Sequence, residues 1–312
     1  MYFAFEYLSP EFVQNTTNAL EELQAVHCGK PFNIFVLIDG AFDEDILTKM
    51  FGTGSRCISL YEGTPLSGFG KAALFLAQID TEKVPLTSWI AKLVDLSGNR
   101  PMWSVIAAAI EIDKFAKHLA PFLIAKSDDS LEWPVRWGDV RVLPQLLDEL
   151  DSSFVADLLK PIYSWLVPSR NGNLLARRGQ GRFEYRTVEY EKLPMKETTF
   201  ARLVEISEPD MILSQIYERQ PEYLRLLPPS ECHRRVARQL RIADKFNMEQ
   251  PAVRQHFSTI ALFLREDFID MPALKELLVK VSKGSDYMNQ IGSLDTLFWE
   301  AATVDAEEIK ST

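Results

Sequence analysis

The sequence predicts an α/β protein with an N-terminal mixed sheet covered by helices, followed by a smaller all-α domain. Short apolar runs alternate with amphipathic segments up to about residue 195, as expected for strands and helices that share one sheet. From residue 198 onward only helical periodicity recurs. We therefore expect two domains, residues 1–195 and 196–312, which agrees with a length of 312 residues.

Five short apolar runs in the first half are expected to be strands. They are Asn33–Ile38, Cys57–Tyr61, Leu74–Ile79, Trp103–Ala109 and Trp133–Trp137. Apolar residues recur at helical spacing in the segments 42–50, 85–94, 112–123 and 143–150. A basic, glycine-containing loop or hairpin turn over residues 168–181 precedes a final edge strand, Phe183–Tyr190. Strands that alternate with helices favour a parallel or mixed sheet.

The second half is expected to be helical. Helical periodicity is present in the segments 199–218, 230–246, 250–264 and 271–282, and prolines separate them. The polar residues 305–312 are expected to fray. Hydrophobic residues make up 46% of the chain and charged residues 25%, so the composition is that of a globular protein.

Net charge and cysteine content narrow the function classes. Lys and Arg total 34 and Asp and Glu total 44, so the net charge of −10 repels phosphate backbones and general nucleic-acid binding is not expected. Three scattered cysteines indicate neither a disulfide framework nor a thiolate metal site. The first residues do not resemble a signal peptide, and no apolar run is long enough to span a bilayer. We expect a cytoplasmic protein without membrane insertion.

Asp39 is the strongest catalytic candidate, because it stands at the carboxyl end of a predicted strand. With Asp43 or Asp139 it would form a metal-dependent hydrolase or phosphoryl-transfer site that holds Mg²⁺. Asp43, however, falls in the first turn of a predicted helix, where the helix dipole favours carboxylates. The stretch Gly63–Lys71 lacks the glycine and hydroxyl positions of a phosphate-binding loop. A metal-dependent enzyme that uses Asp39 is therefore kept as the alternative to a non-catalytic binding protein.

The histidines and cysteines form no set that indicates catalysis. His118 lies on a predicted helix flanked by apolar residues, and we expect it to be partly buried. Cys232 and His233 are adjacent, and neighbouring side chains on a helix diverge by about 100°, which is poor geometry for a nucleophile and its base. We expect no catalytic residue, no metal ligand and no cofactor.

The most distinctive charge feature is basic and lies in the predicted helix 230–246. Arg234, Arg238 and Arg241 recur on one face of it, and Arg235 is adjacent. This face is either an ordinary solvated surface or an electrostatic docking site for an acidic protein, and these four arginines are its candidate residues. A nucleic-acid-binding module ranks last, because aromatic residues do not alternate with the arginines.

A set of short motifs occurs in a fixed order along both halves of the chain. They are Leu37–Ala41 (LIDGA), Leu60–Pro65 (LYEGTP), Met102–Val105 (MWSV), Pro134–Arg141 (PVRWGDVR), Gln220-Pro221, Phe257–Leu264 and Asp267–Pro272. As a set they resemble the effector adaptor (effector chaperone) family of the bacterial type VI secretion system, over about residues 30–285. Gly138 departs from the pattern, since the family has an aromatic residue there.

This resemblance implies a non-catalytic protein that binds a toxic effector in the producing cell and helps to load it onto VgrG, the protein at the tip of the secretion spike. The motif positions that match the family supply further candidate partner-binding residues: Asp39, Tyr61, Glu62, Arg136, Asp139 and Arg141. We expect Arg136, Asp139 and Arg141 either to form an internal ion-pair network or to face a partner.

Overall fold

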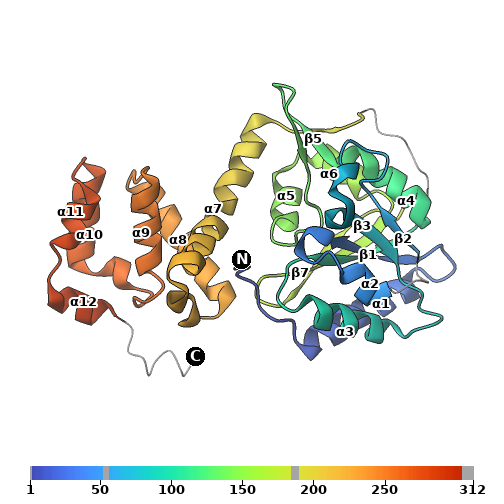
Figure 1. Cartoon of the computed structure of the whole chain (residues 1–312), viewed down its shortest axis with the longest axis horizontal. Helices are drawn as coiled ribbons and strands as arrows, with labels where there is room; N and C mark the ends of the chain where they lie inside the picture. Colours follow the sequence, from blue (N-terminus) through green and yellow to red (C-terminus); the bar gives the residue numbers. More distant parts are fainter. Residues whose placement is uncertain (1, 52–55, 184–189, 304–312) are drawn as a thin grey trace. The chain divides into compact units, whose positions relative to one another are not determined.

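The computed structural model describes residues 2–51, 56–183 and 190–303, which form two compact units (Figure 1). One unit is Phe5–Ile206, and the other is Ser207–Thr312 together with Met1–Ala4. The division after Ile206 lies inside the long helix α7 (Glu197–Arg219), whereas the sequence placed it after residue 195. The α/β class and the helical C-terminal part are confirmed.

A six-stranded sheet forms the centre of the first unit. Its strands are β1 (Asn33–Asp39), β2 (Cys57–Ser59), β3 (Leu74–Gln78), β4 (Trp103–Ala108), β7 (Ile162–Pro168) and β8 (Leu174–Arg178), in the order β2-β3-β1-β4-β7-β8. Every pairing in this sheet is antiparallel, which differs from the parallel or mixed sheet that the sequence favoured.

The reason for this difference is that helices link strands that are not neighbours. β1 and β2 are both antiparallel to β3, which lies between them, so the helix α2 (Ile46–Phe51) links two strands of the same direction. The helix α3 (Leu86–Ser97) links β3 to β4 in the same way across β1. The alternation of strands and helices predicts the direction of the linked strands correctly, but it does not show that another strand is inserted between them.

Helices cover both faces of this sheet (Figure 1). Neighbouring residues of a strand point to opposite faces. Ile34 faces the side of α1 (Pro10–Val26), α2 and α3, and together they line a hollow, whereas the Phe35 ring stacks on Phe115 of α4 (Ile112–Leu119) at 5.2 Å. The other helices of this unit are α5 (Leu143–Glu149), α6 (Ser152–Leu158) and three short 3₁₀ turns, η1 (Gly40–Phe42), η2 (Ser67–Ala72) and η3 (Ala120–Phe122). The buried core therefore has two layers, one on each face of the sheet.

A small second sheet contains the fifth predicted strand. Its strands are β5 (Ile124–Lys126), β6 (Glu132–Pro134) and β9 (Leu193–Pro194), in the order β6-β5-β9. β6 overlaps the predicted strand Trp133–Trp137 but ends earlier. The predicted edge strand Phe183–Tyr190 lies outside the described residues except at its two ends.

The second unit is built of helices that begin at prolines or capping aspartates. They are α8 (Pro229–Lys245), α9 (Pro251–Ile260), α10 (Pro272–Ser282), α11 (Tyr287–Gly292) and α12 (Thr296–Ala302), with the turns η4 (Pro221–Arg225) and η5 (Phe268–Asp270). The four helices predicted after residue 198 are present as α7 to α10. Phe257, Phe268 and Leu274 lie in the core of this unit. None of the described helices is both long and apolar enough to cross a membrane.

Candidate functional site

Asp39 ends β1 and is a buried structural carboxylate. Its Oδ1 accepts a hydrogen bond from the Ala41 N–H at 3.0 Å, which caps the turn η1. Its Oδ2 accepts two hydrogen bonds from Arg136, from Nη2 at 2.7 Å and from Nε at 3.1 Å. Both oxygens are therefore engaged by the protein itself.

A second ion pair lies beside the first, and one aromatic ring connects them. Arg141 donates to both oxygens of Asp139, from Nε at 3.0 Å and from Nη2 at 2.8 Å. The guanidinium of Arg136 lies 5.0 Å from the centre of the Phe42 ring, and that of Arg141 lies 5.7 Å from it. Cations at this distance from a ring are attracted by its quadrupole. The two ion pairs are thus held against one ring.

Arg136 is the open part of this arrangement. Its side chain is 45% exposed, whereas that of Asp39 is 7% exposed. The Arg141–Asp139 pair is almost completely buried. Of the two outcomes that the sequence left open, an internal ion-pair network is what the structure shows for Asp139 and Arg141. Arg136 combines an internal ion pair with a surface that a partner can reach.

Tyr61 and Phe69 extend this surface. Tyr61 is buried, and burial together with the nearby Asp39 charge raises the pKa of its hydroxyl to about 12, although Arg136 acts in the opposite direction. The Tyr61 ring meets the edge of Phe69 at 5.6 Å, and Phe69 is 48% exposed. Glu62 is exposed. We call Asp39, Phe42, Tyr61, Phe69, Arg136, Asp139 and Arg141 the β1-end cluster.

Two glycines allow the segments of the β1-end cluster to approach closely. A Cβ on Gly138 would lie 2.7 Å from the Asp39 Cβ and 2.8 Å from a methyl carbon of Leu74. A Cβ on Gly40 would lie 2.1 Å from the Lys71 carbonyl oxygen. The departure from the family pattern at Gly138 therefore has a physical reason in this chain, since no side chain fits there.

The carboxylates proposed for a metal-dependent enzyme each bind a cation of the protein. Asp43 lies 3.0 Å from Lys49 and 2.9 Å from Arg100. Burial opposes ionisation of Asp43, but the hydrogen bond from Lys49 and the Arg100 charge outweigh it, so its pKa is lowered. Among the described residues, no three His, Cys, Asp or Glu side chains are grouped to hold a metal ion.

Three of the four candidate arginines of α8 form ion pairs with acids of their own unit. Arg234 lies 2.6 Å from Glu231 and 2.8 Å from Glu266, and Arg238 lies 2.9 Å from the same Glu266. Arg235 is largely buried, pairs with Glu231 at 2.9 Å and donates to the carbonyl oxygens of Ala261 and Leu264. Arg241 is exposed. The sequence alone therefore overestimates how many unpaired positive charges α8 presents.

The expectation that His118 is partly buried is confirmed. His118 is buried, and its Nε2 lies 2.9 Å from the Leu158 carbonyl oxygen. Cys232 is completely buried in the core around α7 and α8. These side chains serve packing in the structure.

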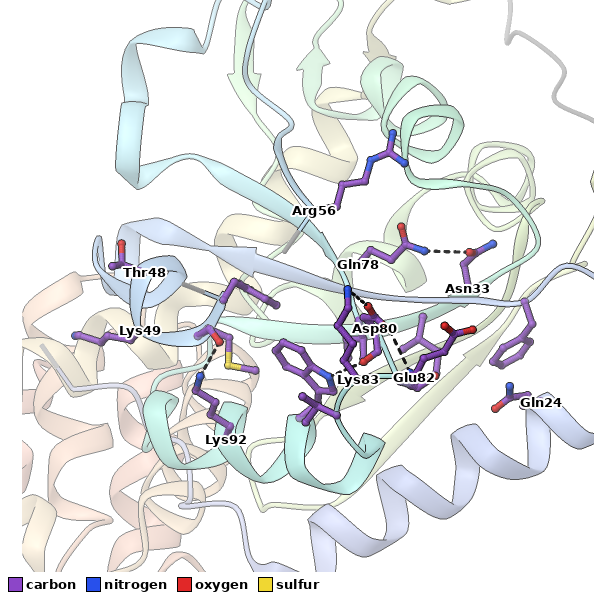
Figure 2. A pocket seen from close by; sticks show the side chains of 18 residues that line it. Gln24, Asn33, Thr48, Lys49, Arg56, Gln78, Asp80, Glu82, Lys83 and Lys92 are labelled. Atoms are coloured by element: carbon purple, nitrogen blue, oxygen red, sulfur yellow. Dashed lines mark hydrogen bonds and ion pairs between the residues drawn. The ribbon is translucent and has the colours of Figure 1, made fainter. Parts of the chain in front are cut away.

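A hollow of about 880 Å³ lies beside α2 and α3 (Figure 2). Trp89 and Phe51 contribute its apolar wall. Its lysines already have partners: Lys92 donates to the Met50 carbonyl at 2.7 Å and Lys83 pairs with Asp80 at 2.8 Å. None of the ten candidate residues lines this hollow.

Sequence reasoning missed Phe42, Phe69 and Glu266. Phe42 was interpreted as part of a helical stripe, and only the fold shows that two arginines lie on it. Phe69 stands in the glycine-containing stretch that was tested solely as a phosphate loop. Glu266 is far from α8 in the chain, so no local spacing signals its contact with Arg234.

A chain with this α/β unit and this cluster matches one known family in part. Residues 34–155 match the family described as a domain of unknown function, DUF4123. This family is associated with effector adaptors of type VI secretion. The matched residues include the whole β1-end cluster and exclude α8. No curated protein and no solved structure matches the chain.

Proposed function

We propose that the chain is a cytoplasmic, non-catalytic adaptor of type VI secretion that binds a toxic effector and helps to load it onto VgrG. The observation that carries this proposal is the DUF4123 match over residues 34–155, because it contains every member of the β1-end cluster. The ordered motifs of the sequence support the same conclusion. Effector and VgrG are therefore the partners to test.

The β1-end cluster is the part of the first unit best suited to contact one of these partners. Its inner residues are fixed by two ion pairs, a capping bond and a shared ring. Its outer residues, Arg136 and Phe69, offer a cation and an aromatic ring to solvent. Arginine and aromatic side chains are enriched among the residues that dominate binding energy at interfaces. Because the inner residues hold the surface rigid, less conformational entropy is lost on binding.

The alternative of a metal-dependent hydrolase receives no support from this geometry. Asp39 would have to give up both Arg136 and the Ala41 N–H before its oxygens could bind Mg²⁺. Docking through α8 is also weakened, because Glu231 and Glu266 already occupy Arg234, Arg235 and Arg238.

The test is a comparison of two exposed apolar residues of the same unit. Phe69 is 48% exposed in the β1-end cluster, and Leu131 is 54% exposed elsewhere. Tagged Phe69→Asp and Leu131→Asp variants are expressed in the native cell, and the retained toxin and VgrG are quantified by mass spectrometry. We expect Phe69→Asp to lower recovery of at least one of them about tenfold or more, because a charge then replaces an interface ring.

The control variant Leu131→Asp should retain both proteins at the level of the parent chain. Equal recovery by the two variants would show that the β1-end cluster is not the contact surface. Failure of the parent chain to retain either protein, in cells shown to express both, would contradict the adaptor function itself.

A further inference from the structure

The strand β8 presents an unpaired backbone edge. The Ser169 N–H donates to the Asn173 oxygen at 2.8 Å, and the Gly179 N–H donates to the Tyr163 oxygen at 3.2 Å, so odd-numbered residues of this hairpin face β7. Backbone groups alternate in direction along a strand. The N–H and C=O groups of Leu174, Ala176 and Arg178 therefore point away from β7, and β8 ends the sheet among the described residues.

The hairpin that carries this edge is rich in arginine. Residues 169–183 contain four arginines and no acidic residue, in a chain of net charge −10. Arg177 pairs with Asp148 of α5. Arg178 is exposed, and no described acid forms an ion pair with it. Glu231 and Glu266 hold Arg234, Arg235 and Arg238 of α8, whereas Arg178 keeps its charge available for a partner.

A hollow of about 440 Å³ lies beside the edge, between α1 and the strands β7 and β8; its lining is mostly apolar, and Glu22 of α1 borders it as well. Leu23 and Val26 of α1 line it, and Val26 is 76% exposed. Ala176 and Arg178 line it from β8, so both side chains point to the face that α1 covers. A residue paired opposite Ala176 would send its side chain toward this hollow, and one paired opposite Arg178 would meet a guanidinium.

We propose that the β8 edge binds an extended, acidic segment of a partner protein as an additional strand of the sheet. This inference rests on the proposed adaptor function for the partner being a protein. The backbone groups of Leu174, Ala176 and Arg178 supply the hydrogen bonds of the added strand. An apolar side chain of the segment enters the hollow beside α1, and a carboxylate two residues away pairs with Arg178.

The charge favours this occupant over a second copy of the chain. Pairing two β8 edges would bring together two hairpins that each carry arginines and no acid over residues 169–183. Such pairing is opposed by like charges, whereas an acidic strand is attracted. A short, charged edge strand can instead protect a sheet against pairing with other chains. The peptide titration below distinguishes this protective function from the binding of an acidic strand.

The probe is a fluorescein-labelled peptide of eight residues in which valine and aspartate alternate, titrated with the full chain and followed by fluorescence anisotropy. Saturable binding is expected, together with slower hydrogen exchange at the Ala176 and Arg178 amides. A peptide of the same composition with four valines followed by four aspartates, and one with lysine in place of aspartate, should bind about tenfold more weakly or worse.

Two variants, each with a matched control, test whether the Ala176 N–H and the Arg178 guanidinium bind the peptide. Ala176→Pro removes an outward N–H and should weaken binding about tenfold, whereas Ala176→Val keeps that donor and should bind as the parent chain does. Arg178→Glu should abolish binding, whereas Lys245→Glu makes the same charge change in the other unit and should not affect it. Circular dichroism checks that each variant is folded.

The proposal is overturned if the alternating peptide does not bind, or if Ala176→Pro and Arg178→Glu bind it as the parent chain does. It is also overturned if a single-stranded oligonucleotide binds the chain, through Arg178, and the alternating peptide does not. A dimer that Ala176→Pro dissociates would also overturn it, in favour of a second copy. The peptide titration uses no secretion component, so it can fail while toxin and VgrG are still retained, and it can succeed when they are not.

Discussion

Removing the Arg136 guanidinium should destabilise the first unit through Asp39. In Arg136→Met the carboxylate loses the two hydrogen bonds of 2.7 and 3.1 Å that end on its Oδ2. It keeps only the Ala41 N–H as a donor to Oδ1. The Asp39 side chain is 7% exposed, so water replaces the lost donors poorly.

The expected loss in the free energy of unfolding follows from the exposure of the two side chains, since Asp39 is buried and Arg136 is not. Removing the partner of a buried polar group costs about 1–3 kcal/mol, and more when the group is charged. Because Arg136 is itself 45% exposed, solvent screens part of its charge, and we expect a loss of about 2 kcal/mol in the free energy of unfolding. In the Asp39→Asn background the same change should cost about 0.5 kcal/mol, a coupling of about 1.5 kcal/mol.

Urea unfolding followed by tryptophan fluorescence measures these values. Five of the six tryptophans lie between residues 5 and 206, so the signal reports mainly on the unit that contains the pair. The control is Arg56→Met, because Arg56 and its partner Asp113 are each more than half exposed. We expect the control to cost about 0.5 kcal/mol or less.

The reasoning is refuted if Arg136→Met costs no more than Arg56→Met. It is also refuted if the effects of Asp39→Asn and Arg136→Met simply add, since a shared interaction requires them to be coupled.

Three further perturbations test other parts of the account. Arg235→Ala should lower the stability of the helical unit by about 2 kcal/mol and Arg241→Ala by less than about 0.5, measured by hydrogen exchange at the amides of α8, because of these two only Arg235 is largely buried and bonded to carbonyl oxygens. Equal effects would contradict this. Gly138→Ala should cost about 2 kcal/mol, since its Cβ would lie 2.7 Å from a neighbouring carbon, whereas Gly68→Ala has open space and should be near neutral. Burial lowers the pKa of His118 below 6.5, so the folded state binds that proton less readily than the unfolded state, and stability should fall as the pH drops through and below about 6.5. His118→Gln should flatten this dependence between pH 7.5 and 5.5, and an unchanged slope would exclude His118 as its source.

Local patterns predicted most elements, because apolar periodicity reports directly on burial. β1, β3 and β4 were expected within one or two residues of their observed ends, and so was α10. The inner strand β7 was not predicted, although all its residues are buried, because its short apolar run does not alternate. α1 was missed as well, although Ser9 caps it and Pro10 opens it.

The candidate site was predictable residue by residue but not as an assembly. Motif matching selected Asp39, Arg136 and Arg141 from positions far apart in the chain. Their pairing depends on where the segment after β6 folds back onto the end of β1, and Phe42 becomes a shared ring only there. Likewise, the positive charge of α8 is readable from its spacing, but its neutralisation by Glu266 depends on tertiary structure.

The central claim is that this chain loads a toxic effector onto VgrG. The most direct test isolates VgrG from native cells that lack the chain and measures the co-purified effector by quantitative mass spectrometry. The account predicts that the effector is lost from VgrG, that the parent chain and Leu131→Asp restore it, and that Phe69→Asp does not. An unchanged amount of effector on VgrG in cells without the chain would contradict it.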